Sequence, residues 1–169
     1  MKLYAESSAV VAWLLGEAAA DGVRDCLRQA DLVITSDLTL VECDRALLRE
    51  HRSTRLTEAD VADRRAHLNA AAASWHVLHA SAAGIERARR DFPVEPLGTL
   101  AALHLASALV ARAAVPGLAV LALDDTIRRN AHQLGFRVVP GTTPSITPEK
   151  AAPGVRPPVR TTPGGGGTE

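Results

Sequence analysis

Short apolar segments typical of β-strands alternate with longer helical segments along residues 1–141. Leu32–Thr35 and Leu118–Leu123 carry the β-branched and aliphatic residues that favour strands, whereas 37–50 and 100–114 carry the apolar spacing of helices. Strands separated by helices usually pair in parallel, because each helix returns the chain to the same edge of the sheet. The alternation therefore predicts a three-layer α/β/α sandwich with a mainly parallel central sheet.

The residues at the expected ends of the helices agree with this pattern. We expect Ser8 and Asp125 to be helix N-caps, and Thr57 with Asp60 has the spacing of a capping box. Gly135 follows the last predicted helix at the position where a left-handed residue often ends one. The remaining strands are predicted at Leu3–Ala5, Trp75–Leu78 and Phe136–Val139.

Acidic residues occupy comparable places in this pattern. Glu6 directly follows the first predicted strand, Asp124 follows Leu118–Leu123, and Glu42 lies early in the helix after Leu32–Thr35. Residues at the carboxyl ends of parallel strands converge on one edge of the sheet, where sites usually form. Clustered carboxylates repel each other unless a divalent cation lies among them. The pattern predicts a metal-dependent enzyme of phosphodiester chemistry.

Each of these residues also has a simpler interpretation. Glu6 could be an exposed residue at a strand end, and Glu42 could pair with Arg45 or Arg49 on a helix surface. Asp124 and Asp125 could both serve the helix that follows them, although we expect Asp125 to be the cap and Asp124 to remain free. The sequence alone leaves these alternatives open.

Two other polar positions carry weaker signals. His104 lies in a largely apolar helical segment, which is typical of a packed core or interface residue. Cys26 and Cys43 have no metal-like spacing, so we expect two free, reduced thiols.

Composition limits the possible functions further. The chain has 19 basic and 19 acidic residues, which argues against binding nucleic acid by bulk charge alone but permits a local basic rim around an acidic pocket. The sequence shows no signal peptide and no apolar run of the ~20 residues that a membrane span needs. We therefore expect a cytoplasmic protein with no membrane association.

A change in composition marks the end of the predicted folded domain. After Pro140 and Gly141, the segment 142–169 is rich in proline and glycine and has few large apolar residues. Such a segment cannot bury enough apolar surface to offset the entropy of ordering, so we expect a disordered tail. The sequence predicts one domain, residues 1–141, followed by that tail.

The order of these motifs resembles the PIN-domain family, and in particular VapC-type toxins of type II toxin–antitoxin modules. The first motif is similar to Leu3–Val11, including the acidic Glu6 before two serines, and the second is similar to Val33–Glu42. The third resembles Thr99–Ala108. The fourth resembles Val120–Asp124 together with Asn130, Ala131 and the segment Leu134–Phe136. The resemblance covers about residues 1–140.

The resemblance implies an Mg²⁺-dependent or Mn²⁺-dependent endoribonuclease that pairs with a cognate antitoxin protein and could form a homodimer. Carried over to this chain, Glu6, Glu42 and Asp124 would be the metal ligands and catalytic carboxylates. Further candidates for orienting groups or for contacting RNA are Ser8, Ser36, Asp125 and Arg128.

This chain departs from the family pattern at two important positions. Glu6 stands where the family usually has Asp, which keeps the charge but lengthens the side chain by one methylene. Ala101 stands where the third motif normally has Asp, so one negative charge and one oxygen ligand are missing. Gly98 also replaces a residue that is often basic in relatives. We expect nuclease activity to be reduced or absent while the fold persists.

Two alternatives belong to other functional classes. The chain could be a noncatalytic PIN-like module that binds an antitoxin or RNA through apolar helices. It could also be a phosphotransfer or hydrolase domain built on Asp124 and Asp125. The second alternative fits poorly, because the lysines of the chain, Lys2 and Lys150, lie outside the positions where such a domain would need a supporting lysine.

Overall fold

The computed structural model describes residues 1–141, and within them strands alternate with helices as predicted. The strands are β1 (Lys2–Ala5), β2 (Leu32–Ser36), β3 (His76–Leu78), β4 (Ala119–Leu121) and β5 (Val138–Val139). The helices are α1 (Ser7–Leu15), α2 (Ala20–Arg28), α3 (Asp37–Arg52), α4 (Glu58–Ala72), α5 (Ala82–Ala88), α6 (Thr99–Ala114) and α7 (Asp125–Gln133). The predicted tail, 142–169, lies outside the described residues.

The strands form one parallel sheet in the order β3-β2-β1-β4-β5. β1 lies at the centre, where Tyr4 is in register with Ile34 of β2 and Val120 of β4. The chain proceeds outward from β1 to β3 on one side and from β4 to β5 on the other. The strand order therefore reverses between β1 and β4, and a crevice forms at the carboxyl ends of strands at such a point.

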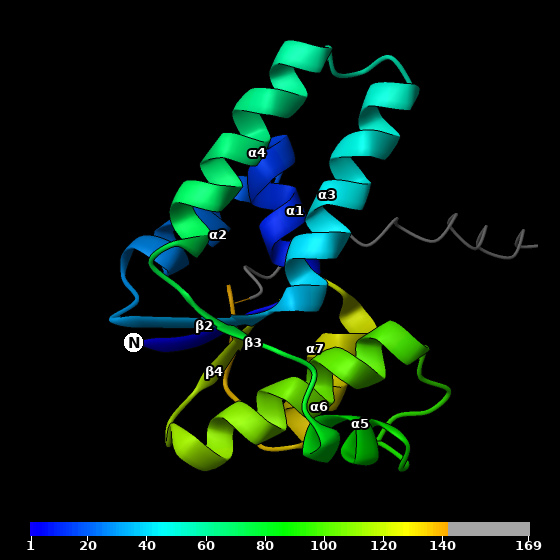
Figure 1. The fold of residues 1–169 in the computed structure, drawn as a ribbon. Helices are drawn as coiled ribbons and strands as arrows, with labels where there is room; N and C mark the ends of the chain where they lie inside the picture. Colours follow the sequence, from blue (N-terminus) through cyan, green and yellow to red (C-terminus); the bar gives the residue numbers. More distant parts are fainter. Residues whose placement is uncertain (142–169) are drawn as a thin grey trace, which may run out of the picture.

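Helices cover both faces of the sheet, which confirms the three-layer sandwich (Figure 1). Successive residues of a strand point to opposite faces. Leu3 and Ala5 of β1 therefore pack in the core beneath α1–α4, whereas Tyr4 packs with α6 and α7 on the other face. In Figure 1, α3 and α4 form a long hairpin that extends away from the sheet.

The N-caps of two helices differ from those predicted. Glu6, not Ser8, is the N-cap of α1, because its own carboxylate accepts a hydrogen bond from the Ser8 amide. Asp124, not Asp125, is the N-cap of α7, since its Oδ1 accepts from the Ile127 amide at 2.8 Å. Both corrections give the acidic residue at a strand end a structural role in addition to any chemical one.

Other local predictions hold. Thr57 and Asp60 form the capping box that opens α4, and Gly135 adopts a positive φ of 82° after α7. β4 is shorter than the predicted Leu118–Leu123, because the amides of Leu123 and Asp124 donate to the Ser8 hydroxyl instead of to a neighbouring strand. Among residues 1–141, no helix is both long enough and apolar enough to cross a membrane.

Candidate active site

A pocket of about 610 Å³ lies at the carboxyl ends of β1 and β4, where the strand order reverses. Its walls come from the starts of α1 and α7, one face of α3 from Leu38 to Arg49, and the first two turns of α6. The polar and charged side chains in its lining are Glu6, Ser7, Ser8, Glu42, Arg45, Arg49, His104 and Asp124. The structure thus brings the three carboxylates predicted from the sequence to one pocket.

Glu6 is held rigidly at the junction of β1 and α1. Its side chain is buried, with only 2% of the residue exposed. Oε1 accepts a hydrogen bond from the Ser7 hydroxyl at 2.7 Å, and Oε2 accepts from the Ser8 amide at 3.0 Å and from the Ser8 hydroxyl. The amino end of α1 favours a negative charge at this position. These contacts orient the Glu6 carboxylate toward the pocket.

Glu42 reaches the same point from the second turn of α3. The Thr35 hydroxyl donates to the carbonyl of Ala5 at 2.7 Å, which fixes the end of β2 beside the end of β1. α3 begins directly after β2, so Glu42 lies close to Glu6. Its Oε1 is 3.0 Å from Nε2 of His104 and its Oε2 is 2.6 Å from the Ser7 hydroxyl.

These contacts affect the ionisation of Glu42. The hydrogen bond from His104 is the main cause that holds the pKa of Glu42 below its ordinary value. The Ser7 hydroxyl lowers the pKa further, and partial burial opposes both effects. Glu42 is therefore an anion at neutral pH, beside a second carboxylate.

Ser7 lies between these two carboxylates. Its oxygen is 2.7 Å from Oε1 of Glu6 and 2.6 Å from Oε2 of Glu42. A hydroxyl carries a single hydrogen, so it can donate to only one of two ionised carboxylates at a time. The contact between Ser7 and the other carboxylate then brings two oxygens together without a hydrogen between them. Such a contact is favourable only if that carboxylate is protonated or a cation lies nearby. The donor set thus fits a divalent cation, for which carboxylate oxygens are the preferred ligands.

His104 is the functional candidate that the sequence did not reveal. It was predicted to be a packed core residue, and it is indeed buried, with 1% exposure. However, its ring lies against Glu6 and Glu42, with Nε2 3.9 Å from Oε1 of Glu6. Glu6, Glu42 and His104 form a cluster in which one potential ligand atom from each residue lies within 4.8 Å of the other two. The signal in the sequence was the spacing of three residues from Ala101, which puts both on one face of α6.

Asp124 lines the same pocket but lies outside this compact cluster. It is exposed, and its Oδ1 is used to cap α7. The Ser8 hydroxyl accepts hydrogen bonds from the amides of Leu123 at 2.8 Å and Asp124 at 3.0 Å, while it donates to Glu6. Ser8 thus joins the ends of β1 and β4 and fixes the position of Asp124 relative to Glu6.

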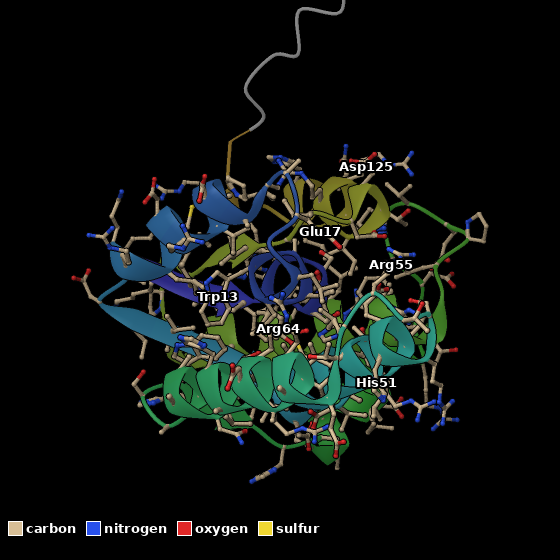
Figure 2. All side chains as sticks on the ribbon, turned by 90° about the horizontal axis from the view of Figure 1, so that it is seen from above. Trp13, Glu17, His51, Arg55, Arg64 and Asp125 are labelled. Carbon is tan, nitrogen blue, oxygen red and sulfur yellow. The ribbon has the colours of Figure 1, made fainter. Side chains whose placement is uncertain are left out.

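The other predicted residues lie away from the pocket. Arg128 donates to the backbone carbonyls of Ala122 at 2.7 Å and Pro140 at 3.1 Å, so it joins the segments that follow β4 and β5. Asp125 lies at the outer edge of the molecule, as Figure 2 shows. Ser36 is buried and lies close to Tyr4. None of these three lines the pocket that holds Glu6.

The basic side chains of the pocket come instead from α3. Arg45 and Arg49 follow Glu42 at spacings of three and seven residues, and both are exposed. The sequence suggested them only as partners of Glu42. In the described part of the chain, Glu42 pairs with His104, and neither arginine forms an ion pair. The guanidinium groups of Arg45 and Arg49 therefore place two positive charges at the acidic pocket.

Ala101 forms part of the pocket wall, in the first turn of α6. It lies on the same face of the helix as His104, one turn earlier. The structure thus places Ala101, where the sequence resemblance predicted an acidic residue, at this pocket.

The chain is thus an α/β/α sandwich with a parallel sheet and an acidic pocket at the point where the strand order reverses. Several families of domains share this arrangement. The sequence profile described as PIN domain matches residues 3–133, and the chain belongs to this family. No curated protein sequence matches it.

Among the solved structures that share the fold, two are similar over most of the chain. One is VapC20 of Mycobacterium tuberculosis, described as a toxin that cleaves the sarcin-ricin loop, with a TM-score of 0.56 and 18% sequence identity. The match covers 80% of this chain and 96% of VapC20. The other is PAE2754 of Pyrobaculum aerophilum, with a TM-score of 0.52, 19% identity, and coverage of 82% and 84% of the two chains.

Proposed function

We propose that this protein is a metal-dependent endoribonuclease of the VapC toxin type. The observation that carries this proposal is the meeting of Glu6 and Glu42 in one pocket, with Asp124 in its lining. Membership in the PIN-domain family and the shared fold of VapC20 support the same reaction class. The corresponding partners are an RNA substrate and a cognate antitoxin in the cytoplasm, and a second copy of the chain in a homodimer.

The residues of the pocket suit hydrolysis of a phosphodiester. Glu6 and Glu42 would hold a divalent cation such as Mg²⁺ or Mn²⁺, and Asp124 would complete the acidic lining. When bound, such an ion activates an attacking water and offsets the charge that develops on the phosphate. Ser7 and Ser8 fix the two carboxylates, and Arg45 and Arg49 are placed to contact the RNA backbone.

A noncatalytic binding module is the second candidate, and two observations favour it. Ala101 supplies a methyl group where the resembling family has a carboxylate, so one possible ligand is absent. Val41 and Leu100, two large apolar side chains of the pocket lining, are 58% and 51% exposed. An apolar rim of this kind suits a protein partner better than it suits phosphate.

RNA cleavage by the wild-type chain and two variants distinguishes these functions. With Mg²⁺ or Mn²⁺, we expect Ala101→Asp to raise the cleavage rate by roughly tenfold to a hundredfold, the scale of a change in a metal site. Glu6→Gln should abolish cleavage in both the wild-type and the Ala101→Asp background. Absence of cleavage by all folded variants, with either ion, would contradict the nuclease proposal and favour the binding module.

A further inference from the structure

We infer that His104 is a metal ligand that takes the place of the missing carboxylate at Ala101, and that the site therefore prefers a first-row transition-metal ion to Mg²⁺. This inference deepens the proposed function and rests on it for the use of the ion, but it concerns binding by this chain's own residues. One helical turn beyond Ala101, the imidazole of His104 reaches the pocket that holds Glu6 and Glu42.

The distances among the potential ligand atoms suit one ion. Two atoms each about 2.1 Å from a metal and at right angles to each other lie about 3.0 Å apart. Nε2 of His104 is 3.0 Å from Oε1 of Glu42 and 3.9 Å from Oε1 of Glu6. Small movements of the carboxylates, without a change in the backbone, would place all three around a common centre.

The other nitrogen of the ring has the partner that a metal-binding imidazole needs. Nδ1 of His104 lies 3.3 Å from the phenol oxygen of Tyr4, and Tyr4 as a residue is 1% exposed. A ligating histidine normally donates its second N–H to a fixed acceptor, which sets the tautomer and the direction of the ring. In the metal-free chain, Nε2 carries the hydrogen and donates to Glu42. With an ion bound, the hydrogen would be on Nδ1, where Tyr4 can accept it, and the lone pair of Nε2 would be directed at the ion.

The surroundings of Tyr4 also accommodate this tautomer. When Nδ1 donates to Tyr4, the phenol hydrogen must turn to another acceptor. The hydroxyls of Ser36 and Ser107 approach the phenol. Ser36 Oγ is buried and has no hydrogen bond of normal geometry within residues 1–141. It is therefore a free acceptor at the place where one is required.

The nature of the ligands sets the preference for the ion. Mg²⁺ favours oxygen ligands and keeps several waters, whereas imidazole suits ions such as Co²⁺, Zn²⁺ and Fe²⁺. Two carboxylates and an imidazole form a mixed set that binds these ions more tightly than Mg²⁺. Ala101 leaves the site without the extra oxygen that would favour Mg²⁺.

Titration of the full chain with Co²⁺ alone tests the inference without RNA. Nε2 ligation predicts visible absorption bands from the bound ion and a hyperfine-shifted proton resonance from the Nδ1–H of the imidazole, which disappears in D₂O. The resonance should be absent in His104→Asn, and in Tyr4→Phe it should exchange faster with solvent. Mg²⁺ in hundredfold excess should fail to displace Co²⁺ from the wild-type chain, whereas Ala101→Asp should make displacement easier.

Three outcomes would overturn the inference. They are no Co²⁺ binding, bound Co²⁺ with no exchangeable shifted resonance, and an unchanged spectrum in His104→Asn. If that variant fails to fold, selective ¹⁵N labelling of histidine in the wild-type chain identifies the ligating ring instead. Failure of the nuclease proposal is a separate result, because it would appear as Co²⁺ bound through His104 with no cleavage of RNA.

Discussion

The phenol oxygen of Tyr4 lies 3.3 Å from Nδ1 of His104, on the opposite side of the ring from Glu42. The two rings meet edge to face, with centroids 6.4 Å apart. Burial raises the pKa of Tyr4 well above its usual range, so the phenol stays neutral and keeps both a hydrogen to donate and an oxygen to accept. Residues of β1 and α6, a hundred positions apart, thus position one imidazole at the acidic pocket.

We expect Tyr4→Phe to destabilise the fold by about 1–3 kcal/mol, because it leaves a buried ring nitrogen without its partner. Urea unfolding measures this loss. If the hydrogen bond is responsible, the cost of Tyr4→Phe should shrink in a His104→Leu background, where no nitrogen remains to be satisfied. An equal cost in both backgrounds would mean that the hydroxyl of Tyr4 stabilises the fold through contacts other than the one with His104.

Ser8→Ala should also destabilise the fold by about 1–3 kcal/mol, because one hydroxyl satisfies the amides of Leu123 and Asp124 and donates to Glu6. The matched control is Ser74→Ala, which removes an exposed hydroxyl that bonds only to the carbonyl of Ala71. This control should cost less than about 0.5 kcal/mol. Thermal unfolding of both variants makes the comparison, and similar costs would contradict the linking role of Ser8.

The prediction of the fold succeeded because it rested on repeated local signals. β1, β2 and β4 are short apolar segments between helices, and a parallel sheet with helices on both faces is the arrangement that buries them. The capping box of Thr57 and Asp60 is equally local and was also predicted correctly. Such features depend on residues that are close in the sequence.

The site was predicted less completely because its contacts join distant residues. Glu6, Glu42 and Asp124 do line one pocket, but the hydrogen bond between His104 and Glu42 spans 62 positions and has no local signal. The same limit explains Arg128, whose guanidinium binds the backbone at Pro140. Periodicity indicates which face of a helix a residue occupies, but it does not identify what that face meets.

The pH dependence of stability should show the contribution of Glu42. Its pKa is lower in the folded chain than the ordinary 4.5, chiefly because His104 donates to it. The ionised carboxylate therefore favours folding above this ordinary value, and the contribution disappears as the pH falls through the lower folded-state pKa.

In a buffer with a chelator, the stability difference between the wild-type chain and Glu42→Gln should thus narrow as the pH falls below about 4.5. Urea unfolding across this range measures the difference. Glu17→Gln removes an exposed carboxylate outside the pocket and serves as the control. A constant difference for Glu42→Gln at all pH values would mean that its charge does not contribute to folding.

Arg45 and Arg49 should contribute to RNA binding by neutralising phosphates, because both are exposed at the pocket and form no ion pair within residues 1–141. We expect the double variant Arg45→Gln/Arg49→Gln to bind single-stranded RNA more weakly, irrespective of its sequence. The magnitude of the slope of log affinity against log salt concentration should fall by about 0.7 for each phosphate that the variant no longer neutralises.

Fluorescence anisotropy in the Glu6→Gln background measures RNA binding without cleavage. Arg129→Gln, on α7 and outside this pocket, is the control that should leave the slope unchanged. If both variants give the wild-type slope, the RNA backbone does not pass along α3.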